Sequence, residues 1–209
     1  MEYKNIKIEW LGHASFKLKN SKVIYIDPFE LSDGEKADII LVTHTHYDHC
    51  SLRDIEKIIK DNTLVIGPVD AQSKLGKLGN VKFRWLQPGQ TIETDSIRVT
   101  GYPAYNINKH FHPKSNDWLG YLIEVNGIRV YHAGDTDAIP ELKGLSNIDI
   151  LLLPVGGTYT MNAEEAANIA NAIKPAIAIP MHYGSIVGTE NDAERFKRLT
   201  KMKVEILRH

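Results

Sequence analysis

Short apolar runs with the character of β-strands recur along the first half of the chain and constrain its fold more than any other feature. They are rich in β-branched residues and are bounded by turn-forming residues, which is the pattern that predicts strands. The predicted strands cover residues 6–10, 15–18, 23–26, 39–43, 63–66, 81–86 and 97–101. Asn126-Gly127, a dipeptide that favours a tight hairpin, joins two further predicted strands at 121–125 and 128–131. The chain is therefore predicted to fold around β-sheets.

Helical patterns occur once in the first half and repeatedly in the last third. Ser51 can cap a helix in which Asp54 takes the capping-box position, and an apolar stripe at helical spacing follows. Asn162 and Glu165 have the same relation at the start of a helix that Pro175 ends. Strands are predicted in the same region at 148–155, 176–180 and 204–207, and a last helix at 192–200. The strands of the first half and the alternation of strands and helices in the last third are compatible with an α/β fold, in the broad sense that includes α+β.

Length, charge and cysteine content narrow the class of protein. The 209 residues fit a single domain, 1–209, that is large enough to bury a core without disulfides. With 25 basic and 26 acidic residues the net charge is -1, which argues against a general nucleic-acid-binding surface. Cys50 is the single cysteine, so no intramolecular disulfide can form and a reducing compartment is expected. The sequence shows no secretory signal and no run of about 20 apolar residues, so we expect a cytoplasmic protein without a membrane span.

A cluster of histidines directly follows the predicted strand at 39–43. His44, His46, Asp48 and His49 place three imidazoles and one carboxylate within six consecutive positions, in a chain that has nine histidines in total. An extended segment would point His44 and His46 to one side, and the following turn would bring Asp48 and His49 toward the same space. Imidazole and carboxylate groups are the ligands that zinc and similar divalent ions bind. The cluster therefore predicts a metal site.

The cluster resembles the first metal motif of the metallo-β-lactamase superfamily, and other motifs of that family follow in the same order. An aspartate ends an early strand, here Asp27 in Ile26-Asp27-Pro28-Phe29, and a second lies in Gly134-Asp135-Thr136. A last histidine, His182, follows a late strand in Pro180-Met181-His182-Tyr183-Gly184. The segment around His13, Leu11-Gly12-His13-Ala14-Ser15, is similar to the start of the branch that includes ascorbate-6-phosphate lactonase-like and phospholipase D-like hydrolases.

The resemblance implies a fold, a metal centre and a chemistry. The fold would be a four-layer αβ/βα metallo-β-lactamase sandwich. One ion would be held by His44, His46 and a third histidine, and a second by Asp48, His49 and His182, with Asp135 bridging them. A water between two such ions loses a proton near neutral pH and becomes a hydroxide nucleophile. Asp48 and Asp135 would be the catalytic carboxylates of this dinuclear centre.

The metal expected is Zn²⁺, with Mn²⁺, Ni²⁺ or Fe as alternatives. Members of the superfamily that perform oxygen or nitric oxide chemistry on iron carry a glutamate at the second histidine position, where this chain has His46. This favours hydrolysis over redox chemistry. It does not select one metal, because metal occupancy follows availability as well as the ligand set.

The third histidine is the point at which the chain departs from the family pattern. Asn106 stands where many relatives have a histidine, and asparagine is a poor zinc ligand. The segment 104–117 has little periodicity, as expected of a loop that serves a site, and it contains His110 and His112. We choose His112, because Pro113 restrains it to extended geometry. The alternatives are His110, an ion held by only two histidines with Asp135 and water, or two histidines that line the substrate entrance.

Other residues near the motifs have expected roles. Asn106, Tyr105 and His13 are candidate substrate contacts because they adjoin the motifs, although a structural histidine at position 13 fits equally well. Asp27 is expected to hold the metal loop rather than bind metal. His132 is expected either to support the site from behind the ligands or to pack, and Cys50 to have no role in the site. The glycines at 156 and 157 could cradle an anion or belong to an ordinary loop.

The function predicted is that of a metal-dependent hydrolase acting on an ester, a lactone or a phosphodiester, with a small-molecule substrate as its partner. A nuclease of the same fold is an alternative, which the near-neutral charge disfavours. A metal-binding protein with a weakened or vestigial site is a second alternative, supported only by Asn106. The patterns specify neither the physiological substrate nor the oligomeric state.

Overall fold

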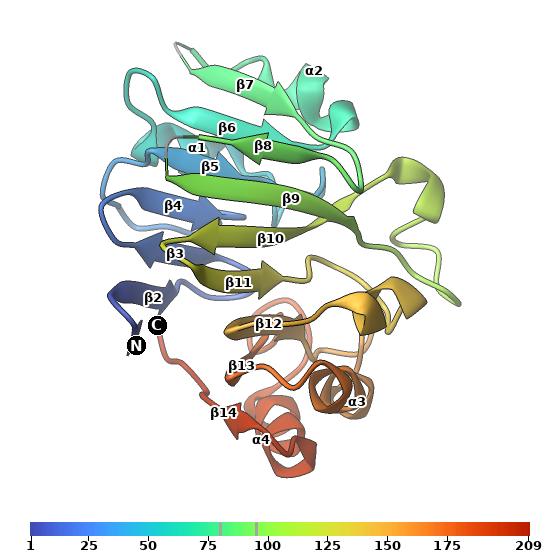
Figure 1. The fold of residues 1–209 in the computed structure, drawn as a ribbon. Helices are drawn as coiled ribbons and strands as arrows, with labels where there is room; N and C mark the ends of the chain where they lie inside the picture. The colour runs from blue at the N-terminus through green and yellow to red at the C-terminus, as the bar shows by residue number, and fades with distance from the viewer. Residues whose placement is uncertain (80, 95) are drawn as a thin grey trace. The chain divides into compact units, whose positions relative to one another are not determined.

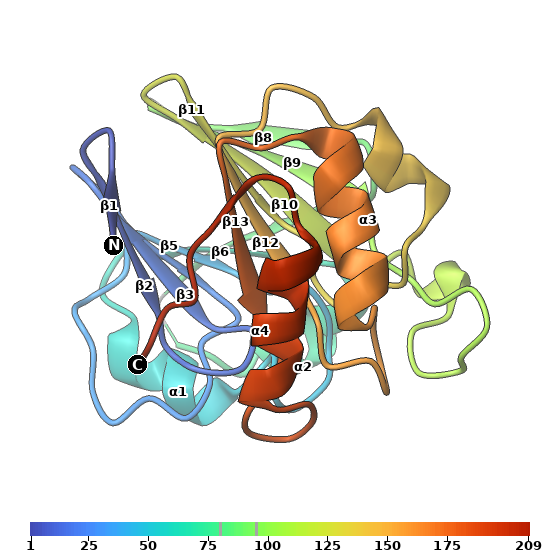
Figure 2. The same cartoon turned by 90° about the horizontal axis from the view of Figure 1, so that it is seen from below.

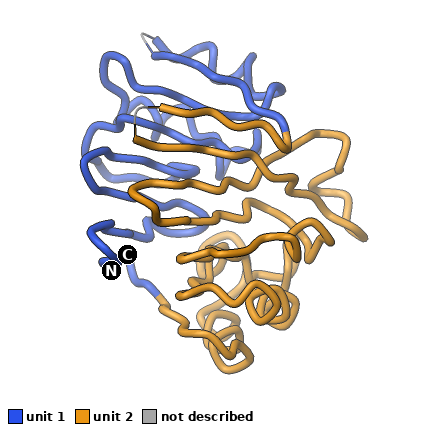
Figure 3. The backbone as a smooth tube through the Cα atoms, viewed as in Figure 1, with its two compact units in different colours: residues 1–87, 207–209 blue, residues 88–206 orange. Residues whose placement is uncertain are grey.

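The computed structural model describes residues 1–79, 81–94 and 96–209, and the chain divides into two compact units. Unit 1 comprises residues 1–87 and 207–209, and unit 2 comprises residues 88–206 (Figure 3). Each unit contains one mixed β-sheet with helices (Figure 1). The α/β class predicted from the sequence is confirmed, whereas the single domain 1–209 stays a prediction.

Unit 1 contains a seven-stranded sheet whose strands lie side by side in chain order. The strands are β1 (Glu2–Tyr3), β2 (Ile6–Trp10), β3 (Phe16–Lys19), β4 (Val23–Ile26), β5 (Ile39–Leu41), β6 (Leu64–Gly67) and β7 (Lys82–Trp85). Neighbours are antiparallel from β1 to β4 and parallel from β4 to β7. The carboxyl ends of β4 to β7 therefore lie at one edge of this sheet, the edge at which ligands bind in α/β proteins.

Helix α1 (Leu52–Ile58) and the short α2 (Gln72–Leu75) pack on the unit 1 sheet. Ser51 caps α1 as predicted, because its side chain accepts a hydrogen bond from the amide of Asp54. The apolar stripe of α1 is buried in a core cluster with side chains from β4, β5 and β6. A 3₁₀ helix (Val69–Ala71) leads into α2.

Unit 2 repeats the strand succession of unit 1. Its strands are β8 (Thr91–Glu93), β9 (Ile97–Pro103), β10 (Leu119–Val125), β11 (Ile128–His132), β12 (Ile150–Pro154), β13 (Ile177–Met181) and β14 (Lys203–Val204), again side by side in chain order. Neighbours are antiparallel from β8 to β11 and parallel from β11 to β14. All five residues of β12 and of β13 are buried, as expected of parallel strands covered on both faces.

Helices α3 (Ala163–Ile173) and α4 (Glu190–Leu199) pack against each other and against β12 and β13 in unit 2 (Figure 2). The predicted capping box of α3 is present, with Asn162 and Glu165 each bonding the other's backbone amide. The helix ends at Lys174, whose left-handed conformation precedes Pro175. Two 3₁₀ helices, Lys114–Asn116 and Pro140–Gly144, complete the unit.

The structure corrects several predicted boundaries. The strand predicted at 39–43 ends at Leu41, and the strand predicted at 204–207 is reduced to Lys203–Val204. Strands β1 and β8 and helix α2 were not predicted, since segments of two to four residues carry too little periodicity to be recognised. Within the described residues 1–79, 81–94 and 96–209, no helix has both the length and the apolar character needed to cross a membrane.

Candidate metal centre

The histidine cluster lies on a loop that follows β5 in unit 1, and we call residues 43–50 the ligand loop. The loop turns into α1 through backbone hydrogen bonds, because the amides of His49 and Cys50 both donate to the carbonyl of His46, at 3.2 and 2.9 Å. Asp27 directly follows the neighbouring parallel strand β4, so it lies at the same sheet edge. The sheet thus places the predicted metal motif and Asp27 together.

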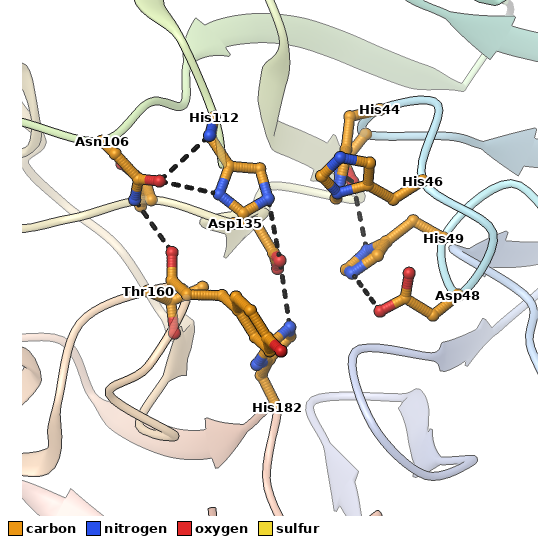
Figure 4. Close-up of polar contacts among 12 residues, drawn as sticks. His44, His46, Asp48, His49, Asn106, His112, Asp135, Thr160 and His182 are labelled. Carbon is orange, nitrogen blue, oxygen red and sulfur yellow. Dashed lines mark hydrogen bonds and ion pairs between the residues drawn. The ribbon is translucent and has the colours of Figure 1, made fainter. Parts of the chain in front are cut away.

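Two imidazole nitrogens of the ligand loop lie close enough to bind a single ion. His44 Nε2 and His46 Nδ1 are 3.0 Å apart (Figure 4). Two nitrogens that ligate one tetrahedral zinc at its usual bond length are about 3.3 Å apart. The two side chains therefore fit neighbouring positions around one metal ion.

Asp27 and Thr43 hold the imidazoles of the ligand loop in one orientation. The fully buried Asp27 carboxylate accepts hydrogen bonds from the Thr43 amide at 2.7 Å, the Thr43 hydroxyl at 2.6 Å and His49 Nδ1 at 2.7 Å. The hydroxyl of Thr43 has one proton, which it gives to Asp27, so it accepts from His44 Nδ1 at 2.9 Å. Because Nδ1 of both His44 and His49 donates a hydrogen bond, the lone pair of each ring is on Nε2. Histidines that bind metal are usually held in this tautomer by such hydrogen-bond acceptors.

His13 lies with the acidic end of the ligand loop. Its Nε2 is 3.0 Å from Asp48 Oδ2, and the ligand atoms of His13, Asp48 and His49 all lie within 4.8 Å of one another. His13 comes from the loop between β2 and β3 and has a φ of 49°, a left-handed conformation that is uncommon for histidine. His13 is predicted from the sequence as a candidate substrate contact, whereas in the structure it lies among the candidate ligands of unit 1.

Asp135 is the centre of the candidate site in unit 2. Its Oδ2 lies 3.0 Å from His182 Nε2 and 3.3 Å from His112 Nε2 (Figure 4). Asp135 follows β11 and His182 directly follows β13, so the parallel strands bring both to one edge of the sheet. His112 comes from the loop between β9 and β10. All three side chains are nearly fully buried, and their mutual distances fit ligands of a common ion.

The loop 104–117 presents His112 and leaves His110 exposed. Asn106 Oδ1 accepts hydrogen bonds from the His112 amide at 3.0 Å and from His112 Nδ1 at 3.1 Å. The same side chain donates from Nδ2 to Asp137 Oδ1 at 3.1 Å and to the carbonyl of Tyr159 at 2.9 Å. The amide of Asn106 is thus used fully within the chain, which favours a role in holding His112 over contact with a substrate.

Asp137 is a site residue that the sequence analysis missed. Its Oδ1 accepts from Lys109 Nζ at 2.5 Å, and its Oδ2 accepts from the amide of Ile107 at 2.9 Å. Together with the bond from Asn106, these contacts fasten the loop that carries His112. The only signal in the sequence was a second aspartate two positions after Asp135.

Three other residues named from the sequence have contacts within the chain that suit a structural role. The Tyr105 hydroxyl donates to the Glu141 carboxylate, with 2.9 Å as the shorter distance, and accepts from Lys114 Nζ at 3.2 Å. His132 Nδ1 accepts from the amide of Gly134 at 3.1 Å, which shapes the turn that carries Asp135. Gly156 must lack a side chain, because a Cβ there would collide with the carbonyl oxygen of His182.

Cys50 packs in the core of unit 1 although it adjoins His49. Its side chain is fully buried in the cluster that includes residues of α1 and β5. Burial raises the pKa of the Cys50 thiol to about 11, so the group is a neutral thiol at physiological pH. That Cys50 has no role in the site stays a prediction, which its burial and raised pKa support.

Comparisons with known proteins agree with these features. A model of the beta-lactamase superfamily domain matches residues 7–182. A UPF0173 metal-dependent hydrolase from Thermoplasma acidophilum is 38% identical over 207 residues, which cover 93% of this chain and 91% of the relative. The family model's match at residues 7–182 therefore includes every candidate ligand from His13 to His182.

Solved structures share the fold. A protein described as a metal-dependent hydrolase from Parabacteroides distasonis is 35% identical, with a TM-score of 0.87, and covers 97% of this chain and 94% of its own. A protein described as a zinc-dependent hydrolase of the metallo-beta-lactamase superfamily, from Thermotoga maritima, is 24% identical, with a TM-score of 0.67, and covers 97% of this chain and 98% of its own. At that identity it shows the fold alone. The metallo-β-lactamase fold expected from the motifs is confirmed, and the chain belongs to the beta-lactamase superfamily domain family.

Proposed function

We propose that this protein, a metal-dependent hydrolase by its family, acts through two divalent ions, with zinc as the first candidate. The family resemblance implies that His44, His46 and a third histidine would hold one ion, and we take His112 as that third histidine. Asp48, His49 and His182 would hold the other ion, and Asp135 would be shared between the two. The resemblance supplies this division between the ions, and the structure supplies the geometry within each unit.

The observation that carries the proposal is the common orientation of the candidate ligands. Three imidazoles, those of His44, His49 and His112, each direct Nδ1 to a protein acceptor. Imidazoles that bind metal through Nε2 characteristically donate their other N–H to such a partner. That three of the candidate ligands share this arrangement supports a metal-binding role for them.

The bound ions would supply a hydroxide by lowering the pKa of a water that they share. The residues of the chain do the remaining work. The carboxylates of Asp48 and Asp135 balance the charge of the ions, and Asp27 and Asn106 keep the imidazoles in place. This set fits the hydrolysis of an ester, a lactone or a phosphodiester, because each presents an electrophilic carbon or phosphorus to the nucleophile and an oxygen to the cation.

The His112 geometry also bears on the alternative of a vestigial site. Asn106 was the reason to consider it, since asparagine replaces a ligand there. His112 Nε2 lies 3.3 Å from Asp135, so the ligand set does not need a histidine at position 106. This supports an intact site.

Metal removal and restoration test the proposal. Protein purified without chelators should contain about two ions per chain by mass spectrometry of the metals. Chelation should abolish hydrolysis, and addition of Zn²⁺, Mn²⁺ or Ni²⁺ in separate arms should restore it and identify the preferred metal. The substrates are nitrophenyl esters, lactones and bis(p-nitrophenyl) phosphate, with single-stranded RNA as the arm that would reveal a nuclease. Undiminished hydrolysis by metal-free protein would overturn the proposal.

A further inference from the structure

We propose that Asn106 is a positioning residue that holds His112 in the tautomer that can bind metal through Nε2. The inference rests on the proposed function only in taking His112 as a ligand. It assigns a role to the residue that stands where the family pattern has a histidine. Asn106 would act through His112 and would itself touch neither metal nor substrate.

The hydrogen bonds of Asn106 determine which way its amide faces. The backbone N–H of His112 can only donate, and it lies 3.0 Å from Oδ1. The carbonyl of Tyr159 can only accept, and it lies 2.9 Å from Nδ2. A flipped amide would set donor against donor and acceptor against acceptor at these contacts. The oxygen of Asn106 must therefore face His112.

The orientation of Asn106 in turn determines the tautomer of His112. Oδ1 has no proton to give, so the bond of 3.1 Å between Oδ1 and His112 Nδ1 requires the proton to be on Nδ1. The lone pair of the neutral ring is then on Nε2, which lies 3.3 Å from Asp135 Oδ2. A lone pair and a carboxylate oxygen at this separation repel each other, and a cation that binds both would stabilise the pair.

The loop around Asn106 is built to keep this geometry. Asp137 accepts from Asn106, from Lys109 and from the amide of Ile107. Lys109 also donates to the carbonyl of Thr160 at 2.8 Å, so the loop is tied to the segment that follows β12. The Lys109 cation offsets the charge of Asp137, and a neutral amide at position 106 adds none. Ordering the loop in advance lowers the entropic cost of binding the metal.

The test compares zinc affinity in four variants by competition with a chromophoric chelator. Asn106→Ala should weaken one of the zinc sites by about 10- to 100-fold, the usual effect of removing a partner behind a metal ligand. Asn108→Ala is the matched control, since Asn108 is an exposed asparagine of the same loop. This variant should bind zinc with the affinity of the wild type. His112→Ala and the Asn106→Ala/His112→Ala double variant complete a cycle. If Asn106 acts through His112, the double variant should bind zinc as His112→Ala does.

A spectroscopic measurement on the wild type keeps the proposal testable even if Asn106→Ala folds poorly. Long-range ¹H–¹⁵N correlation spectra distinguish the two neutral tautomers of histidine, and His112→Ala assigns the signal. We expect His112 of the wild type to be protonated on Nδ1, with and without zinc. Protonation on Nε2 in the metal-free protein, unchanged zinc affinity in folded Asn106→Ala, or additive losses in the double variant would each overturn the proposal.

These outcomes are separable from a failure of the proposed function. If wild-type protein binds no zinc, or if His112→Ala binds zinc as the wild type does, His112 is not a ligand and the proposed function loses that ligand. If His112→Ala loses zinc affinity and Asn106→Ala retains it, His112 is still a ligand and only the positioning role of Asn106 is rejected.

Discussion

The two units share a strand succession but distribute their candidate ligands differently. Each has four strands with antiparallel neighbours followed by strands with parallel neighbours. The loop between the second and third strand contributes a histidine in both, His13 in unit 1 and His112 in unit 2, and an aspartate follows the fourth strand in both, Asp27 and Asp135. In unit 1, however, most candidate ligands lie in one loop after β5, whereas in unit 2 they come from three separate segments. One topology can thus bring together both a contiguous motif and a dispersed one.

The partners behind the ligands differ in charge. Unit 1 holds His49 with the buried carboxylate of Asp27, whereas unit 2 holds His112 with the neutral amide of Asn106. The difference follows from the neighbours, because Asp137 already places a carboxylate beside Asn106. A second carboxylate there would face the first at hydrogen-bonding distance and would repel it.

The largest expected effect comes from removing a ligand from either unit. His46→Ala and Asp135→Ala should each reduce hydrolysis to the background rate, since both units are proposed to supply ligands to the centre. Steady-state assays on the best substrate found above provide the measurement. If one of the two variants kept wild-type turnover, the residue replaced in it would not be a ligand of the catalytic centre.

A second pair of variants sharpens the assignment within unit 2. His112→Ala should lower the metal content by about one ion per chain, because it removes a ligand of a single ion. His110→Ala should leave the content unchanged, because His110 is an exposed histidine of the same loop. Metal analysis after gel filtration compares them. Equal losses in both variants would contradict the role given to His112.

Asp27→Asn tests the charged partner of unit 1. Asp27 accepts three hydrogen bonds in a fully buried position, and an amide would turn one acceptor into a donor facing a donor. We expect a loss of about 1–3 kcal/mol in the free energy of unfolding of metal-free protein. Urea denaturation measures the loss, with the exposed Asn108→Ala as a control. A variant as stable as the wild type would show that the charge of Asp27 is dispensable for the fold.

A smaller effect, dependent on pH, is expected at Asp54 behind the ligand loop. Burial raises the pKa of Asp54, but hydrogen bonds from Lys57 and Ser51, the charge of Lys57 and the amide of Glu30 outweigh it, so the pKa lies below its ordinary value. A carboxylate with a lowered folded-state pKa stabilises the fold above its unfolded pKa, and the contribution is lost as the pH falls through the folded pKa. Asp54→Asn should therefore cost about 1 kcal/mol at neutral pH.

The difference in stability between Asp54→Asn and the wild type should narrow below about pH 4, where the Asp54 carboxyl of the unfolded chain begins to take up its proton, and should vanish once the folded carboxyl is protonated as well. Chemical denaturation across this range provides the measurement. A difference that stayed constant with pH would mean that the carboxylate charge does not carry the effect.

The smallest effect on the metal is expected at Cys50. The buried thiol, with a pKa of about 11, should not react with a disulfide reagent in native protein at mildly alkaline pH, and should react after denaturation. Cys50→Ala should keep the metal content of the wild type. Loss of an ion in this variant would make the cysteine a ligand and would extend the contiguous motif of unit 1.

The contiguous part of the site could be predicted from the sequence, and the dispersed part only in outline. His44 to His49 are close in space because they are close in the chain, so an extended segment and a turn suffice to predict their convergence. Asp135 and His182 were found through the family resemblance. The preference for His112 over His110 depended on Pro113 alone, since both histidines lie in a loop whose path has no periodicity to reveal it.

The sequence by itself determined the α/β class, the capped helices and the ligand loop, because each depends on residues a few positions apart. Only the tertiary structure decided that His13 lies beside Asp48, that Asp137 fastens the loop 104–117 and that Asn106 holds His112. A hydrogen bond forms only when donor and acceptor have the right direction as well as the right distance. The direction of a side chain in a loop depends on the packing of the whole unit, which the sequence does not reveal.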